Sequence, residues 1–285
     1  FESYLINTLQ GNSEAAAAVK AEMKALMRGA VHSYIEYAID YASAGMYEEA
    51  TQLLSFLTED GEATYPMVYY ALGYFASKMG KKEEAVALYK KAETVCPDYC
   101  FPNKLEEVLM LNDAMELNPE GAKAPYYLGN FHYAARIYDE AVACWEKSVS
   151  IDDTYPTVLR NLSLAYYNKQ NDPQKALVTL EKAYKLDESD ARILMELDQL
   201  YKKLRYSHRD RLDFLNAHAE VVEQRDDLCI ERITLYNQLG EYQTAYDLIN
   251  SRKFHPWEGG EGKVTTQYTT SLVELAKKAI ANENY

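Results

Sequence analysis

Residues 122–151, AKAPYYLGNFHYAARIYDEAVACWEKSVSI, contain the pattern that decides the fold. Leu128 and Gly129 are adjacent, Ala141 lies 13 residues after Leu128, and Ser148 lies seven residues after Ala141. Small residues at such places let two antiparallel helices approach closely, because a larger side chain would hold their backbones apart. The stretch therefore predicts a pair of packed helices.

Residues 66–97 repeat this arrangement, with the same steps of 13 and seven residues from Leu72 to Ala85 and from Ala85 to Ala92. The spacing resembles the tetratricopeptide repeat, a helix–turn–helix unit of about 34 residues. The resemblance implies an all-α, right-handed α-solenoid in which stacked helix pairs bury one another's apolar faces.

One position marks the predicted start of each second helix, and successive positions are separated by 35, 22, 34, 35, 36 and 33 residues. These positions are Ala50, Ala85, Glu107, Ala141, Ala176, Leu212 and Ala245. The step of 22 residues is 12 short, which is about one helix. Residues 103–117 are therefore predicted to form a lone helix, and a register error at Glu107 is the alternative.

The repeats lie between two other segments. Residues 1–30 are predicted to be a lead-in with one helix, and residues 252–285 a glycine-rich loop with a capping helix. The predicted repeats are 31–64, 66–97, the lone helix 103–117, 122–151, 156–187, 190–222 and 227–251. Asp172, which precedes Pro173, and Ser207 are expected to cap helices.

The net charge of −14 over 285 residues argues against nucleic acid or an anionic membrane as partner, because both need a positive surface. The basic run 202–211 is the exception, and it is either a solvated helix end or a contact for a phosphate or an acidic peptide. The sequence contains no apolar run long enough to span a membrane. The four cysteines are expected to be free thiols in a reducing, cytoplasmic setting.

No catalytic motif stands out. The five histidines include no His-Glu-x-x-His pair, and neither a Gly-x-Ser-x-Gly elbow nor a phosphate-binding glycine loop is present. The sequence therefore predicts a non-enzymatic protein without cofactor or metal.

The inner face of the predicted stack is expected to form a polar, tyrosine-lined groove, although the same residues could simply pack or solvate that face. The candidates are Tyr70, Tyr74, Tyr126, Asn130, Tyr133, Arg160, Asn161 and Arg192. Asn130 and Asn161 match places that carboxylate-clamping tetratricopeptide domains give to Asn. Because Tyr126 replaces a Lys of that clamp and Glu196 replaces an Arg, a complete clamp is not expected.

A second candidate surface is the glycine-rich loop, whose Trp257 needs something to cover it. The loop is interpreted either as a seal on the last helix pair or as a docking surface for another domain or ligand. The candidate docking residues are Phe254, His255, Pro256, Trp257, Glu258 and Lys263.

A further resemblance rests on residues 126–130, 145–148, 196–201, 223–227 and 254–263. They resemble the repeat region of large bacterial proteins that carry a mutarotase-like β-sandwich domain of unknown function ahead of tetratricopeptide repeats. The resemblance implies that this chain, which begins at Phe1, is the C-terminal repeat region of such a protein.

Two functions follow as expectations. The first is a scaffold that binds a protein or peptide, or its own upstream β-sandwich domain. The second is an accessory module of a carbohydrate-active enzyme, in which Trp257 touches the substrate and catalysis lies upstream.

Overall fold

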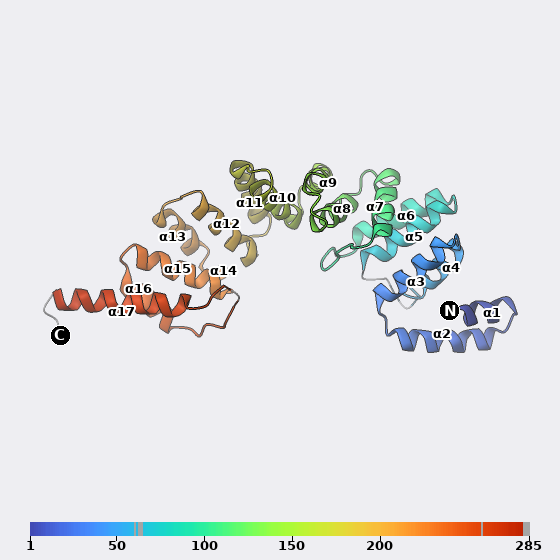
Figure 1. Ribbon diagram of the computed structural model, residues 1–285, viewed down its shortest axis with the longest axis horizontal. Coiled ribbons are helices and arrows are strands. Elements are labelled where there is room, and N and C mark those ends of the chain that lie inside the picture. Colours follow the sequence, from blue (N-terminus) through green and yellow to red (C-terminus); the bar gives the residue numbers. More distant parts are fainter. Residues whose placement is uncertain (60, 62–64, 258, 282–285) are drawn as a thin grey trace. The chain divides into compact units, whose positions relative to one another are not determined.

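The structure is a computed structural model that describes residues 1–59, 61, 65–257 and 259–281. All regular secondary structure in these residues is helical (Figure 1). The chain divides into two compact units, Phe1–Asp153 and Thr154–Tyr285, called unit 1 and unit 2.

Unit 1 is built from helices that pack chiefly against their neighbours in the chain. The strongest contacts join α3 to α4, α5 to α6 and α8 to α9, as antiparallel pairs (Figure 1). Its helices are α1 (Glu2–Leu9), α2 (Ser13–Met27), α3 (Val31–Ser43), α4 (Tyr47–Ser55), α5 (Pro66–Lys78), α6 (Lys82–Thr94), α7 (Leu105–Leu117), α8 (Lys123–Ala134) and α9 (Tyr138–Ile151).

Unit 2 follows the same plan, and its tightest pairs are α10 with α11 and α16 with α17. Its helices are α10 (Pro156–Asn168), α11 (Pro173–Leu186), α12 (Ala191–Lys203), α13 (His208–Ala217), α14 (Ala219–Val222), α15 (Asp226–Gln238), α16 (Tyr242–Asn250) and α17 (Lys263–Ala281). The second helix of the pair predicted at 190–222 is interrupted at His218, whose φ of −116° and ψ of 34° leave the helical region.

The predicted helix caps are formed. The Asp172 carboxylate accepts a hydrogen bond from the Lys175 backbone N–H at 2.9 Å, and Pro173 occupies the first turn of α11. The Ser207 hydroxyl accepts one from the Asp210 backbone N–H at 3.1 Å. Each cap satisfies a donor that the first helical turn leaves unpaired.

The regularly spaced positions form the core of the helix pairs. Ala50, Ala85, Ala141, Ala176, Leu212 and Ala245 are all completely buried. A Cβ atom added to Gly129 would overlap Trp145 of the paired helix, and one added to Gly73 would overlap Tyr89. The small residues therefore give bulky aromatic side chains a place to pack.

The predicted lone helix is present as α7, which packs against α5 and α8 more than against α6. Its Glu107 does not have the packing role of the small residues that share its spacing. The Glu107 carboxylate accepts hydrogen bonds from the backbone N–H groups of Asn103 at 2.7 Å and Lys104 at 2.9 Å. Glu107 is therefore a buried capping residue, and α7 lies beside α5 as a first helix would.

Candidate functional site

An open groove on unit 1 is formed by residues of α3, α4, α5 and α7, and we name it the α3–α7 groove. Its volume is about 230 Å³. Its lining residues are mostly apolar, and Phe75 and Met110 among them are almost completely buried. The lining consists of Ile39, Ala42, Ser43, Tyr47, Tyr74, Phe75, Glu106, Leu109 and Met110.

Two leucines of the lone helix are exposed at this groove. Leu105 is 73% exposed and Leu109 is 55% exposed. They are four residues apart on α7, so they share one helix face, and Leu109 lines the groove. Scattered exposed leucines are ordinary, whereas two on one face beside an apolar groove form a patch of the kind that marks interaction sites.

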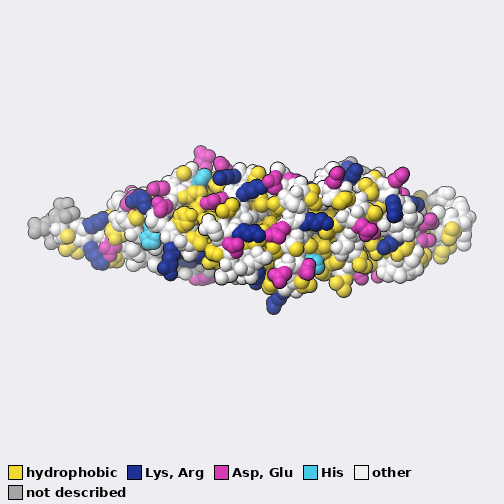
Figure 2. Space-filling model, turned by 90° about the horizontal axis from the view of Figure 1, so that it is seen from above, with side chains coloured by type: hydrophobic (Ala, Val, Ile, Leu, Met, Phe, Trp, Pro, Cys, Tyr) yellow, Lys and Arg dark blue, Asp and Glu magenta, His cyan; other side chains and the backbone are white. Residues whose placement is uncertain are grey.

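The charge of the chain is divided unevenly between the units. Unit 1 has 24 Asp and Glu against 12 Lys and Arg, a net charge of −12, whereas unit 2 has 20 against 18, a net charge of −2. On the face seen in Figure 2, charges of both signs are interspersed and hydrophobic side chains are exposed between them. The negative charge of unit 1 is thus diffuse and acts as a general field around the groove.

Charged side chains also stand at the groove itself. Glu106 lines it and is exposed. The Glu36 carboxylate and the Lys104 ammonium form an ion pair of 2.6 Å, and the Lys78 ammonium lies 4.7 Å from the centre of the Tyr74 ring. The groove therefore combines an apolar floor with a charged rim.

Of the eight residues of the predicted groove, five belong to unit 1, and among these Tyr74 lines the α3–α7 groove. Tyr70 is completely buried, so it does not line an open surface. Its hydroxyl donates a hydrogen bond to the Glu93 carboxylate at 2.9 Å. Burial, together with the negative charge of Glu93, raises the pKa of Tyr70 well above its usual value. Tyr70 is a core residue, contrary to the prediction.

The three other tyrosine and asparagine candidates of unit 1 surround Trp145. The indole N–H of Trp145 donates to the backbone carbonyl of Tyr126 at 3.2 Å and to the Asn130 side-chain oxygen at 3.1 Å. The rings of Tyr133 and Trp145 are 5.3 Å apart. Tyr126 is buried, so the expectation that it lines a groove is wrong. Their common role is to fix the indole against Gly129.

In unit 2, the predicted residues Arg160, Asn161 and Arg192 gather around Glu196. The Arg160 guanidinium donates from Nε to Glu196 Oε2 at 2.7 Å and from Nη2 to Oε1. Its Nη1 donates to the Asn161 side chain at 3.3 Å, and Arg192 Nε lies 3.5 Å from Glu196. Both arginines are thus occupied by one carboxylate, which leaves little positive charge for an anionic terminus.

Beside this cluster lies a smaller cleft between α10, α11 and α12, with a volume of about 120 Å³. The Lys203 ammonium lies 4.6 Å from the centre of the Tyr167 ring at its edge. Its lining is Ser163, Leu164, Tyr167, Asn168, Leu180, Met195, Glu196, Gln199, Leu200 and Lys203. At this volume the cleft can accept a single side chain, and it is too small for a folded segment.

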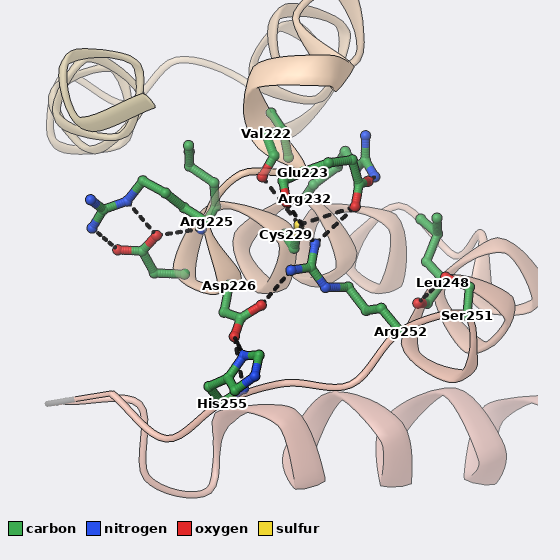
Figure 3. Close-up of polar contacts among 12 residues, drawn as sticks. Val222, Glu223, Arg225, Asp226, Cys229, Arg232, Leu248, Ser251, Arg252 and His255 are labelled. Carbon is green, nitrogen blue, oxygen red and sulfur yellow. Dashed lines mark hydrogen bonds and ion pairs between the residues drawn. The ribbon is translucent and has the colours of Figure 1, made fainter. Parts of the chain in front are cut away.

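The C-terminal loop is tied to the start of α15 by a polar cluster, which we name the C-terminal clasp (Figure 3). Arg252 donates to Asp226 Oδ1 at 2.5 Å and to Glu223 Oε2 at 2.8 Å. The His255 backbone N–H donates to Asp226 Oδ2 at 2.7 Å, and the His255 ring Nδ1 is 3.2 Å from the same oxygen. These contacts hold the chain after α16 against the turn before α15.

The clasp sets the titration of two of its members. Burial alone would raise the pKa of Asp226, but the hydrogen bonds from His255 and the charge of Arg252 outweigh it, so that the pKa lies below its usual value. Burial raises the pKa of the Cys229 thiol to about 12, and the negative charge of Glu223 adds to this. Cys229 is therefore an unreactive neutral thiol in the folded chain.

The predicted docking residues Phe254 and Trp257 pack against a cluster formed by Ile230, Ile233, Ala245 and Ile249. Gly260 lies so close to the Trp257 ring that a Cβ atom there would overlap it. This packing is what the interpretation as a seal on the last helix pair requires. Pro256 is exposed, Lys263 is the exposed first residue of α17, and Glu258 lies outside the described residues.

Sites for other chemistry were sought in the described part of the chain. There, no group of three or more His, Cys, Asp or Glu side chains could hold a metal ion. The four cysteines are free, and burial raises the pKa of Cys100 to about 12. None of the described helices is long and apolar enough to cross a membrane.

The signal for the leucine patch is present in the sequence, because Leu105 and Leu109 are four residues apart in the predicted lone helix. It was missed because the spacing placed Glu107 in a second helix. A helix of that kind would direct this side of α7 into the stack instead of toward the groove.

Residues 68–99 match the family model of the tetratricopeptide repeat. A structure from the functional characterisation of Pseudomonas aeruginosa PilF is 20% identical over 78% of this chain and 90% of that one, with a TM-score of 0.43. MamA of Desulfovibrio magneticus is 19% identical over 69% of this chain and 97% of that one, with a TM-score of 0.37. YrrB, described as a tetratricopeptide protein with an unusual peptide-binding site, is 19% identical over 68% and 87%, with a TM-score of 0.33.

The matched segment contains α5 and α6, the pair in which Gly73 packs against Tyr89. The spacing of this pair recurs along both units, with the lone helix α7 as the irregular element. The chain is thus an all-α stack of tetratricopeptide-type helix pairs.

Proposed function

We propose that this chain is a non-catalytic protein-interaction module whose α3–α7 groove binds an apolar segment of a partner protein. The observation that carries the proposal is the exposed pair Leu105 and Leu109 beside an apolar groove. Covering a leucine side chain completely is worth about 1.5–3 kcal/mol, so two of them supply the centre of an interface.

The charge of unit 1 indicates the chemistry of that partner. A net charge of −12 attracts a cationic chain and repels an acidic one, and rim charges act mainly on the rate of association. The partner segment is therefore an amphipathic helix or strand, with apolar residues that enter the groove and Lys or Arg beside them. The Glu106 carboxylate at the groove is one place where such a cation can pair.

Contact with a carbohydrate through Trp257 has no comparable support. The Trp257 ring packs against the last helix pair and against Gly260, so part of its surface is already used. The accessory-enzyme hypothesis is therefore not pursued as a second function.

The test is the double substitution Leu105→Ser with Leu109→Ser. Peptides selected on the wild-type chain from a random display library should contain apolar residues next to Lys or Arg. The double variant should bind them about 10–100-fold more weakly, which corresponds to about 1.4–2.7 kcal/mol, when Kd is measured by fluorescence anisotropy.

A matched control is available within the same unit. Leu9 and Leu26 are 88% and 74% exposed, and neither lines the groove. The variant Leu9→Ser with Leu26→Ser should bind like wild type, and both variants should unfold at the wild-type temperature. Equal binding by the groove variant and the wild type would refute the proposal.

A further inference from the structure

A second pocket lies at the turn between α12 and α13 of unit 2, within the basic run of the sequence, and we name it the α12–α13 pocket. Its volume is about 430 Å³. Four of its seven lining residues are Lys, Arg or His, although the chain as a whole is acidic. The lining consists of Lys202, Arg205, Tyr206, Ser207, His208, Arg211 and Gln238.

Two of these cations are already paired. Arg211 Nη2 lies 2.7 Å from Asp198 and 2.8 Å from Glu231, and the Lys202 ammonium lies 2.7 Å from Glu231. Two carboxylates thus balance two cations, and this network fixes one wall of the pocket. Asp210 is also nearby, but its carboxylate accepts the Ser207 hydroxyl at 2.6 Å as part of the helix cap.

Arg205 is the cation that is left over. It is exposed, and within the described residues neither Arg205 nor His208 forms an ion pair. The neighbouring Arg209 points its guanidinium to Glu241 at 2.7 Å. An anion that enters the pocket therefore meets an unpaired guanidinium, with five donors in a fork that suits phosphate.

The backbone of Arg205 makes the choice of this residue informative. Its φ is 62°, in the left-handed region that glycine adopts most easily. The corresponding turns after α3, α5 and α15 have glycine there, namely Gly45, Gly80 and Gly240. A side chain at such a position costs about 1 kcal/mol, so a gain elsewhere is needed to offset it.

The turn that presents Arg205 is well fixed. The Arg205 and Tyr206 backbone N–H groups donate to the carbonyls of Lys202 at 3.1 Å and Tyr201 at 3.0 Å. The rings of Tyr201 and Tyr206 are 4.6 Å apart. The guanidinium therefore extends from a rigid base, which lowers the entropy cost of binding.

We propose that the α12–α13 pocket binds the dianion of a phosphomonoester, with Arg205 as the main donor and Lys202 and His208 beside it. The pocket volume exceeds that of a phosphate group, so it also has room for the group that carries the phosphate. Free phosphate and a phosphorylated side chain of a protein share this chemistry. The proposal concerns unit 2 and does not depend on the α3–α7 groove.

The test uses the full chain and the substitution Arg205→Gly. Glycine suits the backbone at this turn, so the variant should be at least as stable as wild type. Titration calorimetry at constant ionic strength, with inorganic phosphate and with a phosphoserine peptide as probes, should show affinity reduced at least about tenfold, equivalent to about 1.4 kcal/mol.

Arg136 gives a closely matched control, because it is an exposed arginine at the same kind of turn in unit 1, with a φ of 64°. Arg136→Gly removes the same charge and changes the backbone in the same way, and it should bind both probes like wild type. Equal loss in the two variants, or no binding by wild type of either probe, would overturn the proposal.

The two probes distinguish the source of the phosphate. Tighter binding of the phosphopeptide than of its unphosphorylated form, with inorganic phosphate as competitor, assigns the site to a phosphorylated protein. Equal affinity for inorganic phosphate and the phosphopeptide assigns it to free phosphate. The Leu105→Ser, Leu109→Ser variant should retain phosphate binding, which separates this site from the proposed protein-binding groove.

Discussion

Arg211 and Asp198 form a bidentate ion pair inside unit 2. Arg211 Nε lies 3.0 Å from Asp198 Oδ1 and Nη2 lies 2.7 Å from Oδ2. The Arg211 side chain is 2% exposed and the Asp198 side chain 0%. The pair joins α12 to α13, and Glu231 extends it to α15. Three helices of the unit are thus linked through one guanidinium.

Removal of one member of this pair should be costly. Asp198→Leu leaves the Arg211 charge buried with only Glu231 to balance it, and we expect a loss of about 3–5 kcal/mol in the free energy of unfolding. Urea denaturation measures this. The double variant Asp198→Leu, Arg211→Met should recover most of the loss, and failure to recover would mean that the pair itself stabilises the unit.

The close approach of α8 and α9 can be tested at Ala141, which is completely buried. Ala141→Leu adds volume at a helix contact, and overpacking should lower the free energy of unfolding by about 1–3 kcal/mol. Ala143 is exposed on the same helix and provides the control, since Ala143→Leu should change stability little. Equal effects in the two variants would contradict the packing described here.

The C-terminal clasp should weaken in acid. Asp226 has a pKa below its usual 3.8 in the folded chain, so its contribution to stability is complete above pH 3.8 and is lost as the pH falls through the lower folded value. Asp226→Asn should reduce the urea midpoint at neutral pH and match wild type in strong acid. Asp213, which is exposed on α13, is the control, and Asp213→Asn should follow the wild type at every pH.

The four cysteines should react with a thiol reagent in a fixed order. Cys96 is exposed and should react first, whereas Cys100 and Cys229 are buried and each has a pKa raised to about 12. Burial also raises the pKa of the half-buried Cys144. Cys96→Ser should remove the fast phase of the thiol titration, and a fast phase that persisted would contradict the assigned burial.

Much of the fold could be predicted because helix pairing leaves a record in residue spacing. A residue that must be small where two helices touch recurs at each repeat, and Ala85, Ala141 and Ala176 are all completely buried. The short step exposed the lone helix. Glu107 was assigned the wrong role because a capping carboxylate fell where the spacing required a packing residue.

The candidate surfaces were harder to predict for a physical reason. Helical periodicity gives the face on which Tyr70 or Tyr126 lies, but exposure depends on which neighbouring helix covers that face. Tyr126 is covered because its backbone carbonyl holds the Trp145 indole, a contact that spans 19 residues of sequence. In contrast, Leu105 and Leu109 stay exposed because α7 has no second helix of its own.

Packing between neighbouring helices also governs how the chain folds. In each unit, most helix contacts join elements that follow one another in the sequence, so few long loops must close before contacts form. Topologies with such local contacts fold quickly, and their stability is close to a sum over neighbouring repeats. A lesion such as Asp198→Leu should therefore accelerate amide hydrogen exchange in α12, α13 and α15 while α5 and α6 keep their protection.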